Sequence, residues 1–188
     1  TLGAEDLAGL PQFLIESAKA EAERRGEEGY VITLSRSSVE PFLTFSARRD
    51  LREKAFQAWA DRGEASNWPL IGEMVQLRAE RARLLGFRNF AEFKLDDQMA
   101  KTPDRVRHLL TTVWAPAKAQ ADREAKQLQD LAAEEGANIQ LAPWDWRYYA
   151  EKLRKRDFDL DEAELKPYLQ LDRMIEAQDD QGDSDERS

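Results

Sequence analysis

The chain has 188 residues, of which 41% are hydrophobic and 35% charged, with a formal net charge of −9 and no cysteine. This composition is typical of a soluble, helix-rich protein, and the length is sufficient to bury a core. The negative charge argues against general binding to nucleic acids or anionic membranes, because both need a positive field. The lack of cysteine excludes disulfides, thiolate metal sites and a cysteine nucleophile, and it is compatible with the cytoplasmic location that we expect.

The N-terminal part predicts one helix and one short extended segment. The helix is predicted over 11–25, with Pro11 in its first turn and Gly26, a common helix-ending residue, directly after it. Residues 30–34, YVITL, are short, β-branched and alternating, so they are the best strand candidate. A second short extended segment is expected near 139–142. Strands beyond these two are not expected.

Two longer helices are predicted next, over 47–63 and 67–86. In the second of them Asn67 is a good cap and Pro69 fits the first turn. Apolar residues recur at helical spacing and predict one buried face on each helix. These residues are Leu51, Ala55 and Trp59 in the first helix, and Leu70, Met74, Leu77, Leu84 and Leu85 in the second.

A short helix packed through phenylalanines is predicted over 87–95, and the longest helix follows it. Thr102 is suited to cap this long helix, Pro103 to occupy its first position and Gly136 to end it. Pro116 removes one backbone hydrogen bond and predicts a kink rather than two helices. One apolar face is predicted from Val106, Leu109, Leu110, Val113, Ala117, Leu128 and Leu131.

Helices are also expected near 145–156 and over 161–176, whereas residues 178–188 form an acidic polar tail without an apolar face. Residues 157–168 place acids at alternate positions like a calcium loop. However, Glu162 and Tyr168 occupy the positions that need Gly and a bidentate Glu. A helix start capped by Asp161 explains the acids better.

Two other features have an ordinary explanation that outweighs a functional one. His108 falls opposite the apolar face of its helix and is expected to be a solvated surface residue. The basic run 152–156 lies where a helix ends, so its charges complement the helix dipole, and acids follow immediately. We therefore assign neither feature to a site. We predict no catalytic residue and no metal ligand in the chain.

The aromatic stretch 142–158, APWDWRYYAEKLRKRDF, allows two interpretations. On a helix starting near Asp145, Trp146 and Tyr149 share a face, and core packing is the simpler explanation. Alternatively, Arg147, Tyr148 and Tyr149 could belong to the wall of a binding site.

Several longer motifs together resemble one enzyme family. They read LRAERARLLGFRNFAEFKL, MAKTPDRVRHLL and APWDWRYYAEKLRKRDFDLDEAELKPYLQLDRMIEA. This combination is similar to the Dcp-like peptidyl-dipeptidases of the thimet oligopeptidase family of zinc metallopeptidases. The resemblance covers nearly all of residues 1–177. It implies that this part is a helical lobe of a larger, mostly α, two-lobed peptidase that encloses a channel and releases C-terminal dipeptides from short peptides. In such an enzyme Arg147, Tyr148 and Tyr149 could line the peptide channel.

The zinc site of that family, H-E-x-x-H with a downstream Glu, has no counterpart in these 188 residues. A catalytic zinc needs about three protein ligands, and the chain has one His and no Cys. We therefore expect a non-catalytic fragment of the peptidase domain over 1–177, with no zinc bound by this chain. The alternative is a free-standing peptide- or protein-binding module derived from such a peptidase. In either case we expect self-association or pairing with a complementary catalytic half.

Overall fold

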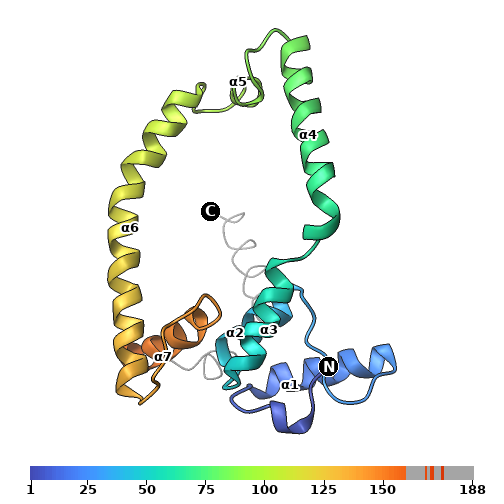
Figure 1. The fold of residues 1–188 in the computed structure, drawn as a ribbon, viewed down its shortest axis with the longest axis vertical. Helices are drawn as coiled ribbons and strands as arrows, with labels where there is room; N and C mark the ends of the chain where they lie inside the picture. The colour runs from blue at the N-terminus through green and yellow to red at the C-terminus, as the bar shows by residue number, and fades with distance from the viewer. Residues whose placement is uncertain (160–167, 169, 172–174, 176–188) are drawn as a thin grey trace, which may run out of the picture. The chain divides into compact units, whose positions relative to one another are not determined.

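The computed structural model describes residues 1–159, 168, 170–171 and 175, and the regular structure of this part is helical (Figure 1). The mostly α prediction is confirmed. The chain divides into Thr1–Tyr149 and Ala150–Ser188, and the boundary falls inside the last described helix. The elements are η1 (Ala4–Asp6), α1 (Gln12–Arg25), α2 (Arg36–Phe45), α3 (Arg49–Ala60), α4 (Glu64–Leu84), α5 (Phe90–Leu95), α6 (Pro103–Glu134) and α7 (Trp146–Phe158).

The first three α-helices enclose an apolar core. Helix α2 contacts both α1 and α3. Leu10, Leu14 and Phe42 are buried at the centre of this core. Partly buried residues surround these three: Leu2, Leu7, Ile15, Ile32, Phe45, Leu51 and Ala55. The core therefore draws on residues from the N-terminus to α3, and it holds α3 in place.

Local capping signals in the sequence explain several helix ends. Gly26 ends α1 in the left-handed conformation, with φ 70°, where its N–H bonds the carbonyls of Ala22 and Glu23. At the start of α6, the Thr102 side chain accepts a hydrogen bond from the Arg105 backbone N–H. The same helix runs through Pro116 without interruption to Glu134. The prediction of one helix rather than two across Pro116 is confirmed.

The two extended segments do not form strands in the part of the chain that the structure describes. Segment 30–34 contributes only an isolated bridge between Tyr30 and Leu2. The next residue, Val31, donates its backbone N–H to the carbonyl of Ala18 in α1 instead of to a second strand. In segment 139–142, the Gln129 amide binds backbone groups of Ile139 and Leu141, and the Asp145 carboxylate accepts the N–H of Ala142. Helical partners thus satisfy backbone groups that a sheet would otherwise pair.

The predicted start of α4 is wrong by about one turn. Helix α4 begins at Glu64, and Gly63, with φ 74°, is its N-cap. Asn67 lies inside the helix, where its backbone N–H bonds the Gly63 carbonyl at 2.8 Å. Pro69 is consequently an interior residue rather than a first-turn residue. Gly63 permits this earlier start because glycine adopts positive φ at little cost.

The predicted buried face of α4 is also wrong. Leu70, Met74 and Leu77 are each about half exposed, and Leu84 is 87% exposed. Only Ala82 is buried among the residues of this helix. The spacing correctly predicted that these residues share one face of the helix, but the described residues leave most of that face exposed. The predicted face of α6 is covered only at one end, where Leu128 and Leu131 are buried.

Some predictions fall outside the described residues. They are most of the helix over 161–176, the Asp161 cap and the acidic tail over 178–188. Within the described residues, no helix combines the length and the apolar character needed to cross a membrane.

The α1–α3 core generates a first prediction. Phe42→Ala removes a side chain that is 1% exposed and should lower the free energy of unfolding by about 3–5 kcal/mol. The matched control is Phe13→Ala, at a side chain that is 45% exposed, which should cost less than about 1 kcal/mol. Urea unfolding followed by circular dichroism measures both. Equal losses for the two variants would contradict this position of the core.

Candidate functional site

The aromatic stretch folds back on α3 around one buried acid. Asp145 is fully buried and directly precedes α7. Its backbone carbonyl accepts the N–H of Tyr149 at 3.0 Å, and its carboxylate accepts the N–H of Ala142 at 3.1 Å. Asp145 therefore closes the turn before α7 and starts the helix, the role that short acidic side chains commonly take at helix N-termini.

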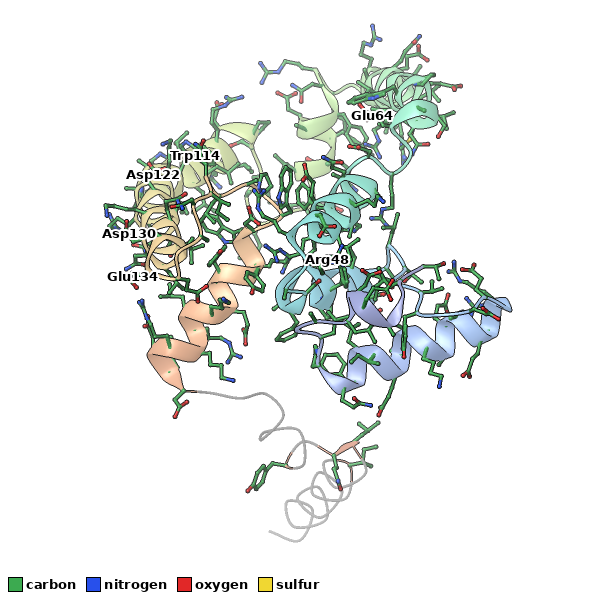
Figure 2. All side chains as sticks on the ribbon, turned by 60° about the horizontal axis from the view of Figure 1, so that its bottom comes forward. Arg48, Glu64, Trp114, Asp122, Asp130 and Glu134 are labelled. Atoms are coloured by element: carbon green, nitrogen blue, oxygen red, sulfur yellow. The ribbon has the colours of Figure 1, made fainter. Side chains whose placement is uncertain are left out.

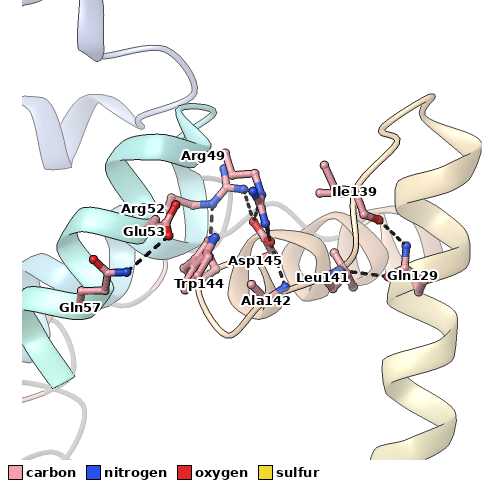
Figure 3. A network of polar contacts seen from close by, with 10 residues as sticks. All are labelled: Arg49, Arg52, Glu53, Gln57, Gln129, Ile139, Leu141, Ala142, Trp144 and Asp145. Carbon is pink, nitrogen blue, oxygen red and sulfur yellow. Dashed lines mark hydrogen bonds and ion pairs between the residues drawn. The ribbon is translucent and has the colours of Figure 1, made fainter.

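Two arginines of α3 complete the bonding of this carboxylate (Figure 3). Arg49 donates from Nε to both carboxylate oxygens at 3.1 Å and from Nη2 to Oδ2 at 2.9 Å. Arg52 donates from Nη2 to Oδ1 at 2.8 Å. The spacing of three residues places both guanidinium groups on one face of α3. We call Arg49, Arg52 and Asp145 the buried ion cluster.

Arg52 is itself almost fully buried, with 2% exposure, and has further partners. It donates to the carbonyls of Ser46 at 2.7 Å and Trp144 at 3.3 Å. Its guanidinium lies 4.1 Å from the ring centroid of Tyr148. A buried cation with this many acceptors is a well-satisfied structural group, because burial without partners would be costly.

Aromatic side chains surround the buried ion cluster. Arg49 lies 5.7 Å from the centroid of the Trp144 ring. Trp144 in turn lies 6.3 Å from Phe56 of α3. Cation–π contacts of this kind add to the ion pairs and limit the access of water. The arrangement can hold two chain segments together, and its charges are mutually neutralised rather than free to act on a ligand.

The electrostatics favour a permanently ionised Asp145. Burial alone would raise the pKa of this carboxyl, but the hydrogen bonds from Arg49 and Arg52 outweigh it and hold the pKa below its usual value. The hydrogen bond to Asp145 likewise raises the pKa of Arg49. Neither group is suited to exchange protons near neutral pH, which argues against general acid–base catalysis here.

The three residues proposed to line a channel have different surroundings. Arg147 is exposed and pairs with Glu40 of α2 at 2.9 Å. Tyr148 is half-buried against Arg52, and Tyr149 is only 4% exposed, with its ring edge-on to Tyr148. Tyr149 is therefore a packing residue in this structure. A contact between any of the three and a peptide remains a prediction.

Other candidate groups are dispersed. His108 is exposed on α6, as expected, and the basic residues Lys155 and Arg156 occupy the last turn of α7. The described residues contain no group of three or more His, Cys, Asp or Glu side chains that could hold a metal ion. The donor set therefore does not fit a catalytic zinc site within the described part. Most of the calcium-loop segment lies outside the described residues.

The buried ion cluster is the feature that sequence reasoning missed. The aromatic stretch predicts Asp145 only as a helix start, and no sequence pattern predicts a role for Arg49 or Arg52. Two features of the sequence could have indicated the cluster. Arg49 and Arg52 are three residues apart and so share one helix face, and Asp145 is an acid between two tryptophans. The pairing itself spans more than ninety residues and has no local signature.

Comparisons with known proteins give one consistent family. A family model described as Peptidase family M3 matches residues 42–179, a range that includes the buried ion cluster. Oligopeptidase A of Salmonella typhimurium is 34% identical over 178 residues, and dipeptidyl carboxypeptidase of Escherichia coli (strain K12) is 35% identical over 174 residues. A probable thimet oligopeptidase of Arabidopsis thaliana is 27% identical over 171 residues.

These similarities cover most of this chain but little of the relatives. The two bacterial proteins are matched over 90% of this chain and 26% of their own length. The Arabidopsis protein is matched over 91% of this chain and 24% of its own length. The chain therefore spans about a quarter of the length of the relatives it matches.

The buried ion cluster predicts a large cost for removing its acid. Asp145→Asn leaves two guanidinium groups without their counter-ion and should lower the free energy of unfolding by about 3–5 kcal/mol. The control is Asp50→Asn, because Asp50 pairs with Arg48 at 2.8 Å but is 64% exposed. This control should cost less than about 1 kcal/mol. A thermal or urea melt compares them, and similar stabilities would show that the cluster is dispensable.

The lowered pKa of Asp145 also predicts a pH dependence. A depressed folded-state pKa contributes stability above the unfolded-state value of about 3.9, and this contribution is lost as pH falls through the folded-state value. The stability difference between the wild type and Asp145→Asn should therefore shrink as the pH drops below about 4. Urea melts between neutral and acidic pH measure it. A difference that stays constant over this range would contradict the assignment.

Proposed function

Because the chain belongs to peptidase family M3, we propose that it forms a non-catalytic helical part of a zinc peptidase and contributes one wall of its peptide channel. The parent fold would hydrolyse short peptides and release C-terminal dipeptides. The names of the bacterial relatives, oligopeptidase A and dipeptidyl carboxypeptidase, support the choice of substrate class. We also propose a cytoplasmic location. One Arabidopsis relative is named a probable cytosolic oligopeptidase A, although another is named organellar.

One observation supports this proposal most strongly: the chain belongs to a peptidase family, but it offers few of the side chains that usually bind a catalytic zinc. A catalytic zinc of this kind is held by about three His, Cys or carboxylate side chains, commonly including two His. These 188 residues contain one His and no Cys. The zinc ligands and the general base of the proposed fold therefore come from residues other than these. For the peptide contact we propose Arg147, which is exposed, and Tyr148, which is half-buried, rather than the buried Tyr149.

The second candidate function is a free-standing peptide- or protein-binding module derived from such a peptidase, which a separate catalytic half could complement. The large apolar side chains exposed on α4 and α6 favour it, because such surfaces commonly mark interaction sites. It differs from the first candidate in one respect: the chain alone would bind peptides measurably.

The proposal predicts that the purified chain alone does not hydrolyse peptides. An internally quenched peptide with a free C-terminus should be cleaved no faster with added zinc than with a chelator. The matched variant is His108→Ala, which should behave identically because His108 has no catalytic role here. Zinc-dependent cleavage that His108→Ala abolishes would contradict the non-catalytic assignment.

Peptide binding separates the two candidates. Fluorescence anisotropy of a labelled short peptide should show no saturable binding by the chain alone if the channel needs further walls. Saturable binding that Arg147→Ala weakens, and that the surface control Arg123→Ala does not, would favour the binding module.

A further inference from the structure

Residues 1–6, residues 32–34, α2 and α3 line an open cavity of about 550 Å³. This volume falls within the range of about 300–1,000 Å³ that is typical of small-molecule sites. More than half of the lining residues are apolar, and four of the others carry a charged side chain. A cavity of this composition is suited to an apolar ligand that carries a small number of charges.

The apolar part of the lining is the outer side of the α1–α3 core. Four of its residues pack against the buried core residues but are themselves only partly buried: Leu2, Ile32, Leu51 and Ala55. Beneath them lies Phe42, which also borders the cavity and is 1% exposed. A ligand that removes the remaining apolar surface of these residues from water gains free energy by the hydrophobic effect.

Helix α3 contributes to both the cavity and the buried ion cluster, but on different sides. At about 100° per residue, the cavity residues Leu51 and Ala55 lie roughly a third of a turn away from the cluster residues Arg49 and Arg52. The charges of the buried ion cluster are therefore not part of the cavity lining. A ligand in the cavity meets a separate set of charged side chains.

Three of these charged side chains form one connected group. Arg48 pairs with Asp6 at 2.6 Å and with Asp50 at 2.8 Å. Figure 2 labels Arg48 where α3 approaches the N-terminal segment. Two carboxylates and one guanidinium give the group a net charge of about −1 at neutral pH. We call Asp6, Arg48 and Asp50 the Arg48 triad.

Lys54 supplies the opposite charge. It is exposed and lies four residues after Asp50, a spacing at which side chains of a helix are neighbours. Both carboxylate oxygens of Asp50 nevertheless accept hydrogen bonds from Arg48. No residue in the described part of the chain forms an ion pair with Lys54. The lining thus offers one ammonium group and one net negative charge on side chains whose Cβ atoms are about 5–6 Å apart.

We propose that this cavity binds an apolar dipeptide with free ends. The side chains of the dipeptide cover the apolar lining, its carboxylate pairs with Lys54, and its ammonium group lies beside Asp50 of the Arg48 triad. A ligand with only one of these charges leaves either Lys54 or the triad unmatched. An extended dipeptide spans up to about 7 Å and a single amino acid only about 3.6 Å, so the dipeptide fits the separation of the charges better.

This inference goes beyond the proposed function, because it assigns a binding site to this chain alone and needs no hydrolysis. It also differs from a peptide contact at Arg147. A peptide whose amino end carries a label lacks the free ammonium group, and a longer peptide separates its two end charges further. Neither is expected to occupy the cavity as the dipeptide does.

The test titrates the chain with leucyl-leucine and follows its backbone amides by NMR. Saturable changes should concentrate on cavity residues such as Leu2, Ile32 and Ala55. Glycyl-glycine should bind several-fold more weakly, because it lacks apolar side chains. N-acetyl-leucyl-leucine and leucyl-leucine amide each lack one charge and should also bind several-fold more weakly. Thr1 lines the cavity as well, so the titration is repeated with its amino group acetylated, which should leave the affinity unchanged.

Two substitutions assign the charges. Lys54→Gln should weaken leucyl-leucine by up to about fivefold and leave the amide probe unaffected, because only a free carboxylate pairs with Lys54. Asp50→Asn should weaken leucyl-leucine by a similar factor and leave the N-acetyl probe unaffected. The matched control is Lys19→Gln, at an exposed lysine of α1 that does not line the cavity, and it should change neither affinity.

Selective losses in the two variants, with saturable changes at the cavity, would support the dipeptide site. An N-acetyl probe that binds as tightly as the free dipeptide would indicate a simple apolar carboxylate and would overturn the assignment. The assignment also fails if the amide changes do not saturate, if they occur mainly at the exposed apolar residues of α4, or if binding requires the free amino group of Thr1.

Discussion

A carboxylate buried away from water must be matched by cations and hydrogen-bond donors, and in this protein Asp145 meets that requirement through Arg49 and Arg52. The residues are far apart in sequence, so the ion pairs close a long loop that contains α4, α5 and α6. Closing such a loop has an entropic cost that grows slowly with its length. Several charge-assisted bonds, two aromatic contacts and the Arg52 bonds to backbone carbonyls offset that cost at one point.

The position of the buried ion cluster in the fold explains how it holds the end of this loop in place. Arg49 and Arg52 belong to α3, which is already held by the apolar core of α1 and α2. Asp145 starts α7, and Gln129 of α6 binds the backbone of the segment leading to it. The C-terminal end of the long loop that contains α4, α5 and α6 is thus attached, through Asp145, to the core formed by α1, α2 and α3. Without the ion pairs, the segment 142–149 would be attached to α3 only through contacts such as that of Trp144 with Phe56.

Helices α4 and α6 show the opposite situation. Their local sequence favours helix formation, but few described residues pack against their apolar faces. Both helices have good helix formers along most of their length, and α6 has a polar cap. Helical structure therefore forms, but the hydrophobic gain that normally accompanies it is realised only near Ala82 on α4 and beyond Leu128 on α6. The apolar residues of both helices are thus suited to burial, but among the described residues only a few of them are buried.

The sequence by itself determined where most helices lie, how α6 is capped and that the chain contains one histidine and no cysteine. These are local or countable properties, so periodicity, capping residues and composition are sufficient to read them. Tertiary structure alone decided that most apolar side chains of α4 and α6 stay exposed among the described residues, and that Asp145 pairs with Arg49 and Arg52. Each of these depends on which groups meet across long stretches of chain, and apolar spacing records only that a face is suited to burial, not whether a partner covers it.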